Sequence, residues 1–184
     1  MKTYFVASIK GRDSYFENYK AIVDALTGLG HSVAEFTLYP SKEYVYGLDA
    51  KEKKEFYEKM SKCISEADIV VVEASYPSIN VGHEITLALE KGKPVIALHI
   101  NGKEPHLLQG LLSEKLLILE YSLDTIREIL EYGIEEAKTR IDMRFTILLP
   151  PKIVGYLNRI SKEKRIPRSV FIRNLIEDKM EEEK

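Results

Sequence analysis

The chain has 184 residues, which is enough for one well-packed core and a small appendage. Its 27 basic and 29 acidic residues nearly balance, so overall charge gives no argument for binding nucleic acid. The single cysteine, Cys63, excludes an internal disulfide framework and fits a reducing cytosol. No Cys and His spacing of a zinc site occurs, and no apolar run approaches the roughly 18–20 residues that span a bilayer. We therefore expect a cytoplasmic protein without a metal, a cofactor or a membrane partner.

Strand and helix patterns alternate through the first 140 residues. Four consecutive apolar residues, Ile69 to Val72, lack polar alternation, as is typical of an interior strand of a parallel sheet. Strands are predicted at Thr3–Ser8, Ser32–Thr37, Ile69–Glu73, Pro94–His99 and Leu116–Tyr121. Helices are predicted at Ser14–Leu29, Ala50–Ser65, Val81–Lys91 and Leu123–Lys138. This order predicts an α/β fold with a five-stranded, parallel, doubly wound (Rossmann-like) sheet and helices on both faces.

The pattern changes after Thr139, and we predict one domain over residues 1–139 and a second over 140–184. Apolar and polar residues alternate from Met143 to Leu149, which predicts a strand. Two helices are predicted to follow, Lys152–Lys164 and one opened by Pro167 that runs to about Glu182. One strand and two helices in about 42 residues are too few to bury a core alone, so the second domain predicts a homodimer or a higher even oligomer.

The second domain is basic although the whole chain is not. Residues 141–184 carry 10 basic and 7 acidic residues, against 17 and 22 in residues 1–140. Between Arg144 and Arg173 there are eight basic residues and one acid, Glu163. This local asymmetry, which the whole-chain charge hides, favours a contact with DNA.

The stretch from Asp68 to Glu84, DIVVVEASYPSINVGHE, is the most informative of the chain. A buried strand leads directly into a loop and the first turns of a helix, and ligands of parallel sheets bind outside the carboxyl ends of the strands. Ser78 and the backbone N–H groups around Gly82 can hold an anion at the helix N-terminus. Glu84 could then face the group to which the anion is attached.

Residues 4 to about 121 resemble the nucleoside 2-deoxyribosyltransferase superfamily, and its 2'-deoxynucleoside 5'-phosphate N-hydrolases most closely. The resemblance rests on Tyr4–Arg12 (YFVASIKGR), on Tyr19 in the first helix, and on residues 67–84 with the pattern Pro-Ser-x-x-Val-Gly-x-Glu. It implies that Glu84 is the nucleophile on the sugar C1' and that Ser78 and Gly82 hold the 5'-phosphate. Substrate-binding roles are also implied for Ser8, Ile9, Gly11, Arg12 and Tyr19.

The implied roles agree with elementary chemistry. An N-glycosidic bond breaks through an oxocarbenium-like state, which a nearby carboxylate can trap covalently. An anchored phosphate places C1' against that carboxylate. The implied substrate is a nucleoside 5'-monophosphate.

Two positions depart from the family pattern. Met60 stands where the family has an Asp that assists the departing base, and Phe36 stands where a His is usual. Glu58 is two positions away and is expected on a different face of its helix. A general acid is commonly worth about 10²–10⁴-fold in rate. Three alternatives follow: a slow enzyme, a substitute acid such as His83, Glu73 or Tyr76, or binding without cleavage.

Each candidate residue also has a simpler structural interpretation. Glu84 could be an acid favoured by the helix dipole, and Ser78 an N-cap. Arg12 could be a solvated loop charge, and Tyr19 a core residue. Cys63 is expected to be a small buried apolar residue.

Residues 144 to about 179 resemble the ribbon-helix-helix fold of small repressors. The matching stretches are Arg144–Pro150 (RFTILLP), Ile166–Ser169 (IPRS) and Phe171–Arg173 (FIR). The resemblance implies that two strands pair across a dimer, that Arg144, Thr146 and Leu148 face the DNA major groove, and that Arg168 and Ser169 hold a phosphate. Leu148 departs from the pattern, because a polar or basic residue is usual there. The alternative is a module that only dimerises.

Three functions are therefore considered. The first is an N-glycosidase or deoxyribosyltransferase acting on nucleoside monophosphates, with a tail that dimerises or binds DNA. The second is a transcription regulator whose first domain senses a nucleotide. The third is an effector that depletes nucleotides and represses its own synthesis. The intact Ser78, Gly82 and Glu84 favour the enzyme, whereas Met60 favours the sensor.

Overall fold

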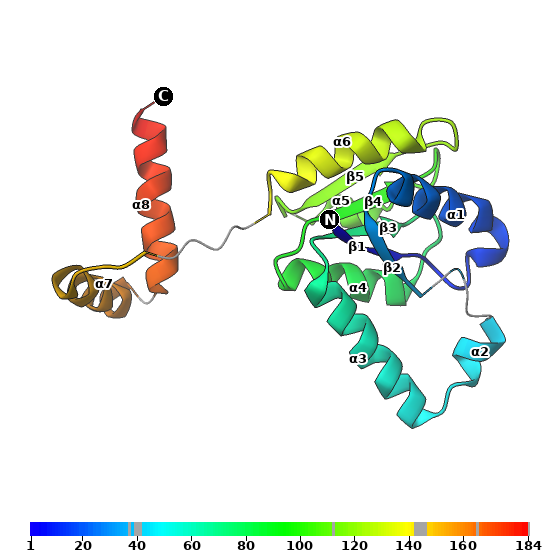
Figure 1. The fold of residues 1–184 in the computed structure, drawn as a ribbon, viewed down its shortest axis with the longest axis horizontal. Coiled ribbons are helices and arrows are strands. Elements are labelled where there is room, and N and C mark those ends of the chain that lie inside the picture. The colour runs from blue at the N-terminus through cyan, green and yellow to red at the C-terminus, as the bar shows by residue number, and fades with distance from the viewer. Residues whose placement is uncertain (37, 39–41, 112, 142–146, 165, 184) are drawn as a thin grey trace. The chain divides into compact units, whose positions relative to one another are not determined.

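The computed structural model of the chain describes residues 1–36, 38, 42–111, 113–141, 147–164 and 166–183. The chain divides into two compact units, residues 1–142 and 143–184 (Figure 1). No helix among these described ranges is long and apolar enough to cross a membrane.

The first unit is built on one five-stranded parallel sheet. Its strands are β1 (Lys2–Val6), β2 (Ser32–Glu35), β3 (Ile69–Glu73), β4 (Val95–His99) and β5 (Leu116–Glu120). Their order across the sheet is β2-β1-β3-β4-β5, and every neighbouring pair is parallel. The predicted α/β fold with a five-stranded parallel sheet is confirmed.

Helices cover both faces of the sheet (Figure 1). The helices of the first unit are α1 (Arg12–Gly28), α2 (Lys42–Gly47), α3 (Ala50–Glu66), α4 (Ile79–Glu90), α5 (His106–Gln109) and α6 (Ile126–Lys138). The core beneath α1 and α6 includes Phe5 and Val71, and the core beneath α3 and α4 includes Tyr4 and Val70. Adjacent residues of one strand thus pack in the cores on opposite faces of the sheet, because successive side chains of a strand point to opposite faces.

The four long helices match their predicted positions, but two short helices were not predicted. Helix α2 has six residues and α5 has four, too few for a helical repeat of apolar residues to show. Helix α3 begins with a capping box, in which Asp49 accepts from Glu52 N–H and Glu52 accepts from Asp49 N–H, both at 2.8 Å. Helix α4 begins two residues earlier than predicted, because Ser78 is its N-cap.

Two loops at the carboxyl ends of neighbouring strands carry the candidate residues. The loop from β1 to α1 contains Ser8 to Gly11, and the loop from β3 to α4 contains Ala74 to Ser78. Since β1 and β3 pair directly, with Val6 opposite Val72, the two loops leave the sheet side by side. This adjacency brings residues about 70 positions apart into one site.

The second unit consists of α7 (Pro151–Lys164) and α8 (Arg168–Glu182), close to the two helices predicted there. Leu157 and Phe171 are buried between them. Residues 147–149 of the predicted strand have no regular structure, and its residues 143–146 lie outside the described residues. Several large apolar side chains remain exposed on this unit: Ile147, Leu148, Ile153, Tyr156, Leu175, Ile176 and Met180.

Candidate active site

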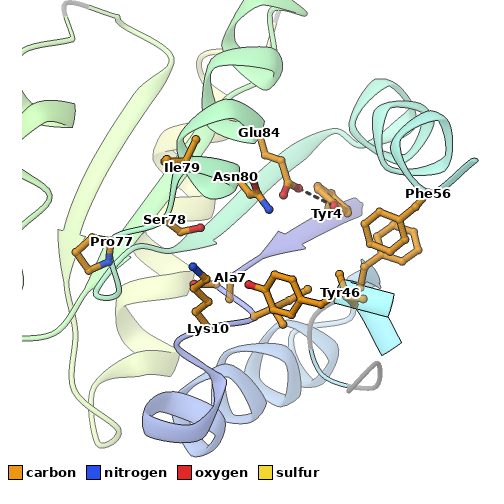
Figure 2. A pocket seen from close by; sticks show the side chains of 14 residues that line it. Tyr4, Ala7, Lys10, Tyr46, Phe56, Pro77, Ser78, Ile79, Asn80 and Glu84 are labelled. Carbon is orange, nitrogen blue, oxygen red and sulfur yellow. Dashed lines mark hydrogen bonds between the residues drawn. The ribbon is translucent and has the colours of Figure 1, made fainter. Parts of the chain in front are cut away.

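A cavity of about 400 Å³ opens at the carboxyl ends of β1 and β3 (Figure 2). Its walls come from the loop after β1, the first turns of α4, the end of β2, α2 and α3. The lining residues are Tyr4, Ala7, Ser8, Ile9, Lys10, Phe36, Val45, Tyr46, Phe56, Pro77, Ser78, Ile79, Asn80 and Glu84. Four of the predicted site residues, Ser8, Ile9, Ser78 and Glu84, are therefore brought together here.

Glu84 is held at the middle of the cavity by a hydrogen bond from Tyr4. The Tyr4 hydroxyl donates to Glu84 Oε2 at 2.8 Å (Figure 2). Tyr4 lies on β1 and is only 2% exposed, so its ring is fixed by the core beneath α3 and α4. A phenol that donates to a carboxylate fixes its direction and stabilises its charge.

Burial makes the Glu84 carboxyl harder to ionise. Removal from solvent raises the pKa of Glu84 from 4.5 to about 7, and the hydrogen bond from Tyr4 opposes that rise. The pKa of Tyr4 is also raised, first by its own burial and then by the neighbouring Glu84 charge, so the phenol stays protonated and can donate. A carboxyl group whose pKa is near neutrality, inside a cavity, is typical of a catalytic group.

One end of the cavity is suited to an anion. Ser78, Ile79 and Asn80 form the start of α4, where the first N–H groups of a helix have no intrahelical acceptor. The Ser78 Oγ accepts from Val81 N–H at 3.5 Å, and its hydroxyl proton remains available to donate. Lys10 adds a cation from the opposite loop at the same end (Figure 2).

Tyr19 and Gly11, which do not line the cavity, fix the shape of the loop after β1. The Tyr19 hydroxyl donates to the Ser8 carbonyl at 3.2 Å, and Gly11 N–H bonds to the carbonyl and the hydroxyl of Ser8 at 3.0 and 3.3 Å. A Cβ added at Gly11 would lie 2.6 Å from the Tyr19 hydroxyl and 2.7 Å from Tyr76 Cβ. Both residues therefore act on the shape of the loop rather than on a bound molecule directly.

The opposite end of the cavity is aromatic. Phe36 and Phe56 pack edge to face with ring centroids 5.6 Å apart, and Phe36 lies 6.0 Å from Tyr4. Phe56, on α3, lies at the end remote from Ser78, whereas the Tyr46 side chain, on α2, extends toward Lys10 (Figure 2). Such a wall suits a flat ring, because aromatic faces stack on one another.

Arg12 and Gly82 are not among the cavity-lining residues. The Arg12 guanidinium lies 5.3 Å from the centroid of the Phe16 ring on α1. Gly82 N–H donates to the Ser78 carbonyl at 3.1 Å within α4, and Gly82 lines a second cavity on the other side of the loop after β3. A Cβ at Gly82 would meet no atom within 4 Å.

None of the predicted substitute acids lines the cavity. Met60 is buried in the core beneath α3 and α4, while Glu58 and His83 are exposed. His83 stacks on Tyr57, with centroids 5.9 Å apart, and Tyr76 lines the second cavity. Among the described lining residues, Glu84 is the single carboxyl group and there is no histidine.

Glu73 is fully buried and belongs to a network behind the loop after β3. Its Oε1 accepts from the hydroxyls of Ser75 and Tyr121, the latter at 3.2 Å. The Ser75 hydroxyl also accepts from Ile100 N–H at 3.0 Å, which ties the loop to the end of β4. Burial raises the pKa of Glu73.

His99, Glu104 and Glu120 lie near one another outside the cavity, with possible ligand atoms within 4.8 Å. Glu120 also accepts from the Asn101 side chain at 3.3 Å, and His99 Nδ1 is 3.1 Å from the Ile100 carbonyl. Exposed acidic groups of this kind are common without an ion.

The predicted DNA-binding residues belong to the second unit. Arg168 and Ser169 form the first turn of α8, and Arg168 Nη1 donates to Asn158 Oδ1 at 3.1 Å. Leu148 is 95% exposed. Arg144 and Thr146 lie outside the described residues.

Sequence reasoning gave no site role to most of the lining residues, among them Tyr4, Lys10, Tyr46 and Phe56. A signal for Tyr4 existed, because a tyrosine on a buried strand needs a partner for its hydroxyl. Lys10 lies within the stretch Tyr4–Arg12, but the resemblance implies no role for it. For Tyr46 no signal existed, since the short α2 that carries it was not predicted.

The comparisons with known proteins point in one direction. No family model matches the chain. The chain is 32% identical over 125 residues to a Thermofilum pendens protein named "Putative 2'-deoxynucleoside 5'-phosphate N-hydrolase 1", which covers 66% of this chain and 86% of that protein. It is 29% identical over 154 residues to the 5-hydroxymethyl-dUMP N-hydrolase of Rattus norvegicus, covering 81% and 87% of the two chains.

A solved structure shares the fold. The CMP N-glycosidase of Clostridium botulinum superposes with a TM-score of 0.52 at 18% identity, over 71% of this chain and 98% of that one. Both sequence matches and this structural match leave about a fifth to a third of the chain uncovered.

Proposed function

This chain belongs to the family of the 2'-deoxynucleoside 5'-phosphate N-hydrolases, and we propose that it cleaves the N-glycosidic bond of nucleoside 5'-monophosphates. The observation that carries the proposal is the pair formed by Glu84 and Tyr4. A carboxyl group with a fixed direction lies between an anion-binding end and an aromatic end of one cavity. A nucleotide has the same three parts in the same order: phosphate, sugar and base.

The phosphate is proposed to bind at the start of α4. The N–H groups of Ile79 and Asn80, the Ser78 hydroxyl and the Lys10 ammonium converge there. Ser8 shapes the facing loop through its bonds with Gly11. Binding of a phosphate at this end holds the sugar C1' near Glu84, which converts the reaction into an intramolecular one.

The chemical step is a displacement at C1'. The bond from C1' to the base nitrogen breaks and its electron pair goes to the base, while a Glu84 oxygen bonds to C1'. Water then hydrolyses this ester and gives the sugar 5-phosphate and the free carboxylate. The Tyr4 hydroxyl holds the second oxygen, Oε2, so that Oε1 can face C1'.

The sensor alternative is less favoured by the cavity. The burial that raises the pKa of Glu84 destabilises the folded protein whenever Glu84 is ionised. A pocket that only bound nucleotides would not need this carboxylate, since a phosphate and a carboxylate repel each other. Retention of Glu84 at this place supports chemistry at C1'.

The test is base release. The full chain is incubated with each common deoxy- and ribonucleoside 5'-monophosphate, and the free base is followed by chromatography. Glu84→Gln keeps the size and a hydrogen-bond acceptor for Tyr4 but cannot attack C1' or accept its charge. Release that requires both Glu84 and the 5'-phosphate supports the proposal, whereas release from no nucleotide refutes it.

For the second unit we propose a dimeric DNA-binding module of the ribbon-helix-helix type. The exposed apolar residues of α8, Leu175, Ile176 and Met180, leave a surface that a second copy can cover. Arg168 and Ser169 at the start of α8 are suited to a DNA phosphate. Gel-shift titration with the DNA upstream of its own gene tests this. Binding that weakens steeply with salt supports phosphate contacts, and a flat salt response refutes them.

A further inference from the structure

Asn80 is a polar residue of the cavity wall that lies between the anion-binding end and Glu84. It belongs to the first turn of α4, it lines the cavity, and it is exposed. Figure 2 shows its side chain between those of Ser78 and Glu84. Within the described ranges of the chain, no residue forms a hydrogen bond with its carboxamide, which is therefore available to a ligand.

The helix places Asn80 and Glu84 on the same face. The two residues are one helical turn apart on α4, and residues at this spacing have Cβ atoms about 5–6 Å apart. Tyr4 holds Glu84 Oε2 and so fixes the direction of the carboxylate. A sugar whose C1' contacts Glu84 is thus within reach of the Asn80 side chain.

The stereochemistry of the proposed displacement determines which face of the sugar meets α4. A nucleophile enters C1' on the side opposite to the departing base. In the common nucleosides the base projects from one face of the sugar ring and the 3'-hydroxyl projects from the other face. Glu84 therefore approaches the face of the sugar that carries the 3'-hydroxyl.

The order of groups along the nucleotide matches the order of residues along α4. The phosphate is joined through C5' to C4', and C3' is the next carbon of the ring. With the phosphate at Ser78 and C1' at Glu84, the 3'-hydroxyl lies against the wall between them, which is where Asn80 projects. A carboxamide can donate a hydrogen bond to a hydroxyl or accept one from it.

The neutral side chain of Asn80 also fits its surroundings. An acidic group at this place would disfavour the ionised form of Glu84 and would repel the phosphate. An amide binds a hydroxyl without adding a charge between these two anions.

We infer that the Asn80 carboxamide binds the 3'-hydroxyl of the nucleotide and so selects sugars that carry this hydroxyl. This inference rests on the proposed function and extends it, because it assigns the residue that recognises the sugar. A nucleotide without the 3'-hydroxyl gains nothing from Asn80.

The test combines two substrates with two proteins. The substrates are the nucleoside 5'-monophosphate that the native chain cleaves fastest and its 3'-deoxy analogue. The measured quantity is kcat/KM for base release by the full chain and by Asn80→Ala. Loss of a neutral hydrogen bond is commonly worth about 2- to 10-fold, so Asn80→Ala is expected to lower kcat/KM by this factor for the substrate with the 3'-hydroxyl. For the 3'-deoxy analogue kcat/KM is expected to be the same in both proteins.

Comparison of the two proteins on each substrate removes the difference in reactivity between the substrates. Lys10→Gln is the matched control, because Lys10 is proposed to bind the phosphate that both substrates carry. Its kcat/KM is expected to fall by the same factor for both.

A second variant guards against a change of fold. Asn80→Ala is expected to keep α4, since Asn80 is exposed and alanine has the higher helix propensity, and thermal unfolding checks this. Asn80→Leu, which is close to asparagine in size and forms no side-chain hydrogen bond, is expected to give the same difference between the two substrates.

The outcomes separate this inference from the proposed function. Equal falls of kcat/KM for both substrates in the Asn80 variants, or no fall for either, overturn the inference and leave the N-glycosidase function standing. Release of no base from any nucleotide by the native chain overturns both.

Discussion

Removal of the Tyr4 hydroxyl is expected to move the pH dependence of the reaction upward. Tyr4→Phe keeps the ring that packs 6.0 Å from Phe36 and removes the donor that lies 2.8 Å from Glu84 Oε2. The ring is 2% exposed and phenylalanine retains it, so the packing around it is expected to be kept. The change therefore isolates one hydrogen bond to the carboxylate.

The size of the effect follows from the energy of that bond. A hydrogen bond to a charged group contributes about 1.5–3 kcal/mol, and about 1.4 kcal/mol corresponds to one pH unit of pKa. The pKa of Glu84, about 7 in the native protein, is then expected to rise to between about 8 and 9. At pH 7 the ionised fraction falls from about one half to between about 9% and 1%, which lowers kcat/KM by about 5- to 50-fold.

The assay is the pH profile of kcat/KM for base release. Measurement above pH 6.5 keeps the substrate phosphate mostly dianionic, because its second pKa is near 6. Tyr4→Phe is expected to regain most of the native rate above pH 9. Tyr132→Phe is the matched control, since Tyr132 is an exposed residue of α6 outside the cavity. An unshifted rising limb in Tyr4→Phe would refute the assigned role of Tyr4.

Three further predictions concern stability. Glu84 has a folded pKa of about 7 against 4.5, so its stabilising contribution is full below about pH 4.5 and is lost as pH rises through 7. Glu84→Gln is therefore expected to be more stable than the native chain in urea unfolding, by about 1 kcal/mol at pH 5 and up to about 3 kcal/mol at pH 8. A gain in stability that does not grow with pH would contradict this prediction. Gly11→Ala places a Cβ 2.6 Å from the Tyr19 hydroxyl, so it is expected to lower the free energy of unfolding by about 1–3 kcal/mol and to raise KM for the nucleotide. Gly82→Ala is the control: its Cβ meets no atom within 4 Å, and KM is expected to stay unchanged. Glu73→Leu leaves the Ser75 and Tyr121 hydroxyls without this acceptor and is expected to lower the free energy of unfolding by about 2–5 kcal/mol in thermal or urea unfolding. Glu73→Gln, which keeps an acceptor oxygen, is expected to cost less than half as much. Equal losses of stability in the two variants would refute the network.

The fold of the first unit followed from local patterns. The uninterrupted apolar run Ile69–Val72 predicted a central strand, and β3 is fully buried between β1 and β4. The resemblance to the N-hydrolases, read from the residues around Ser78 and Glu84, is confirmed by the curated relatives. These features lie in short contiguous stretches, which a sequence displays directly.

The parts of the site that were missed depend on contacts between distant residues. Tyr4 and Glu84 are 80 positions apart, and their hydrogen bond arises because β1 and α4 meet at one edge of the sheet. The position of Gly82 could not be read from the motif either. The motif places a glycine near Ser78, but the helical turn directs its N–H to the Ser78 carbonyl.

The ribbon of the second unit stays a prediction. Its strand is expected to form only when two chains pair, and a single chain cannot satisfy the backbone groups of a lone strand. The apolar surface left exposed on α8 is what such pairing would cover.

The central claim is that Glu84 drives cleavage of the N-glycosidic bond, and it is tested most directly by the rate of free-base release at pH 7.5 in the native chain and in Glu84→Gln, with the nucleoside 5'-monophosphate that the native chain cleaves fastest. We predict release of the free base and the sugar 5-phosphate in equal amounts by the native chain. In Glu84→Gln, which is expected to be at least as stable, the rate is predicted to fall by at least about 100-fold. Base release by Glu84→Gln at the native rate would contradict the account.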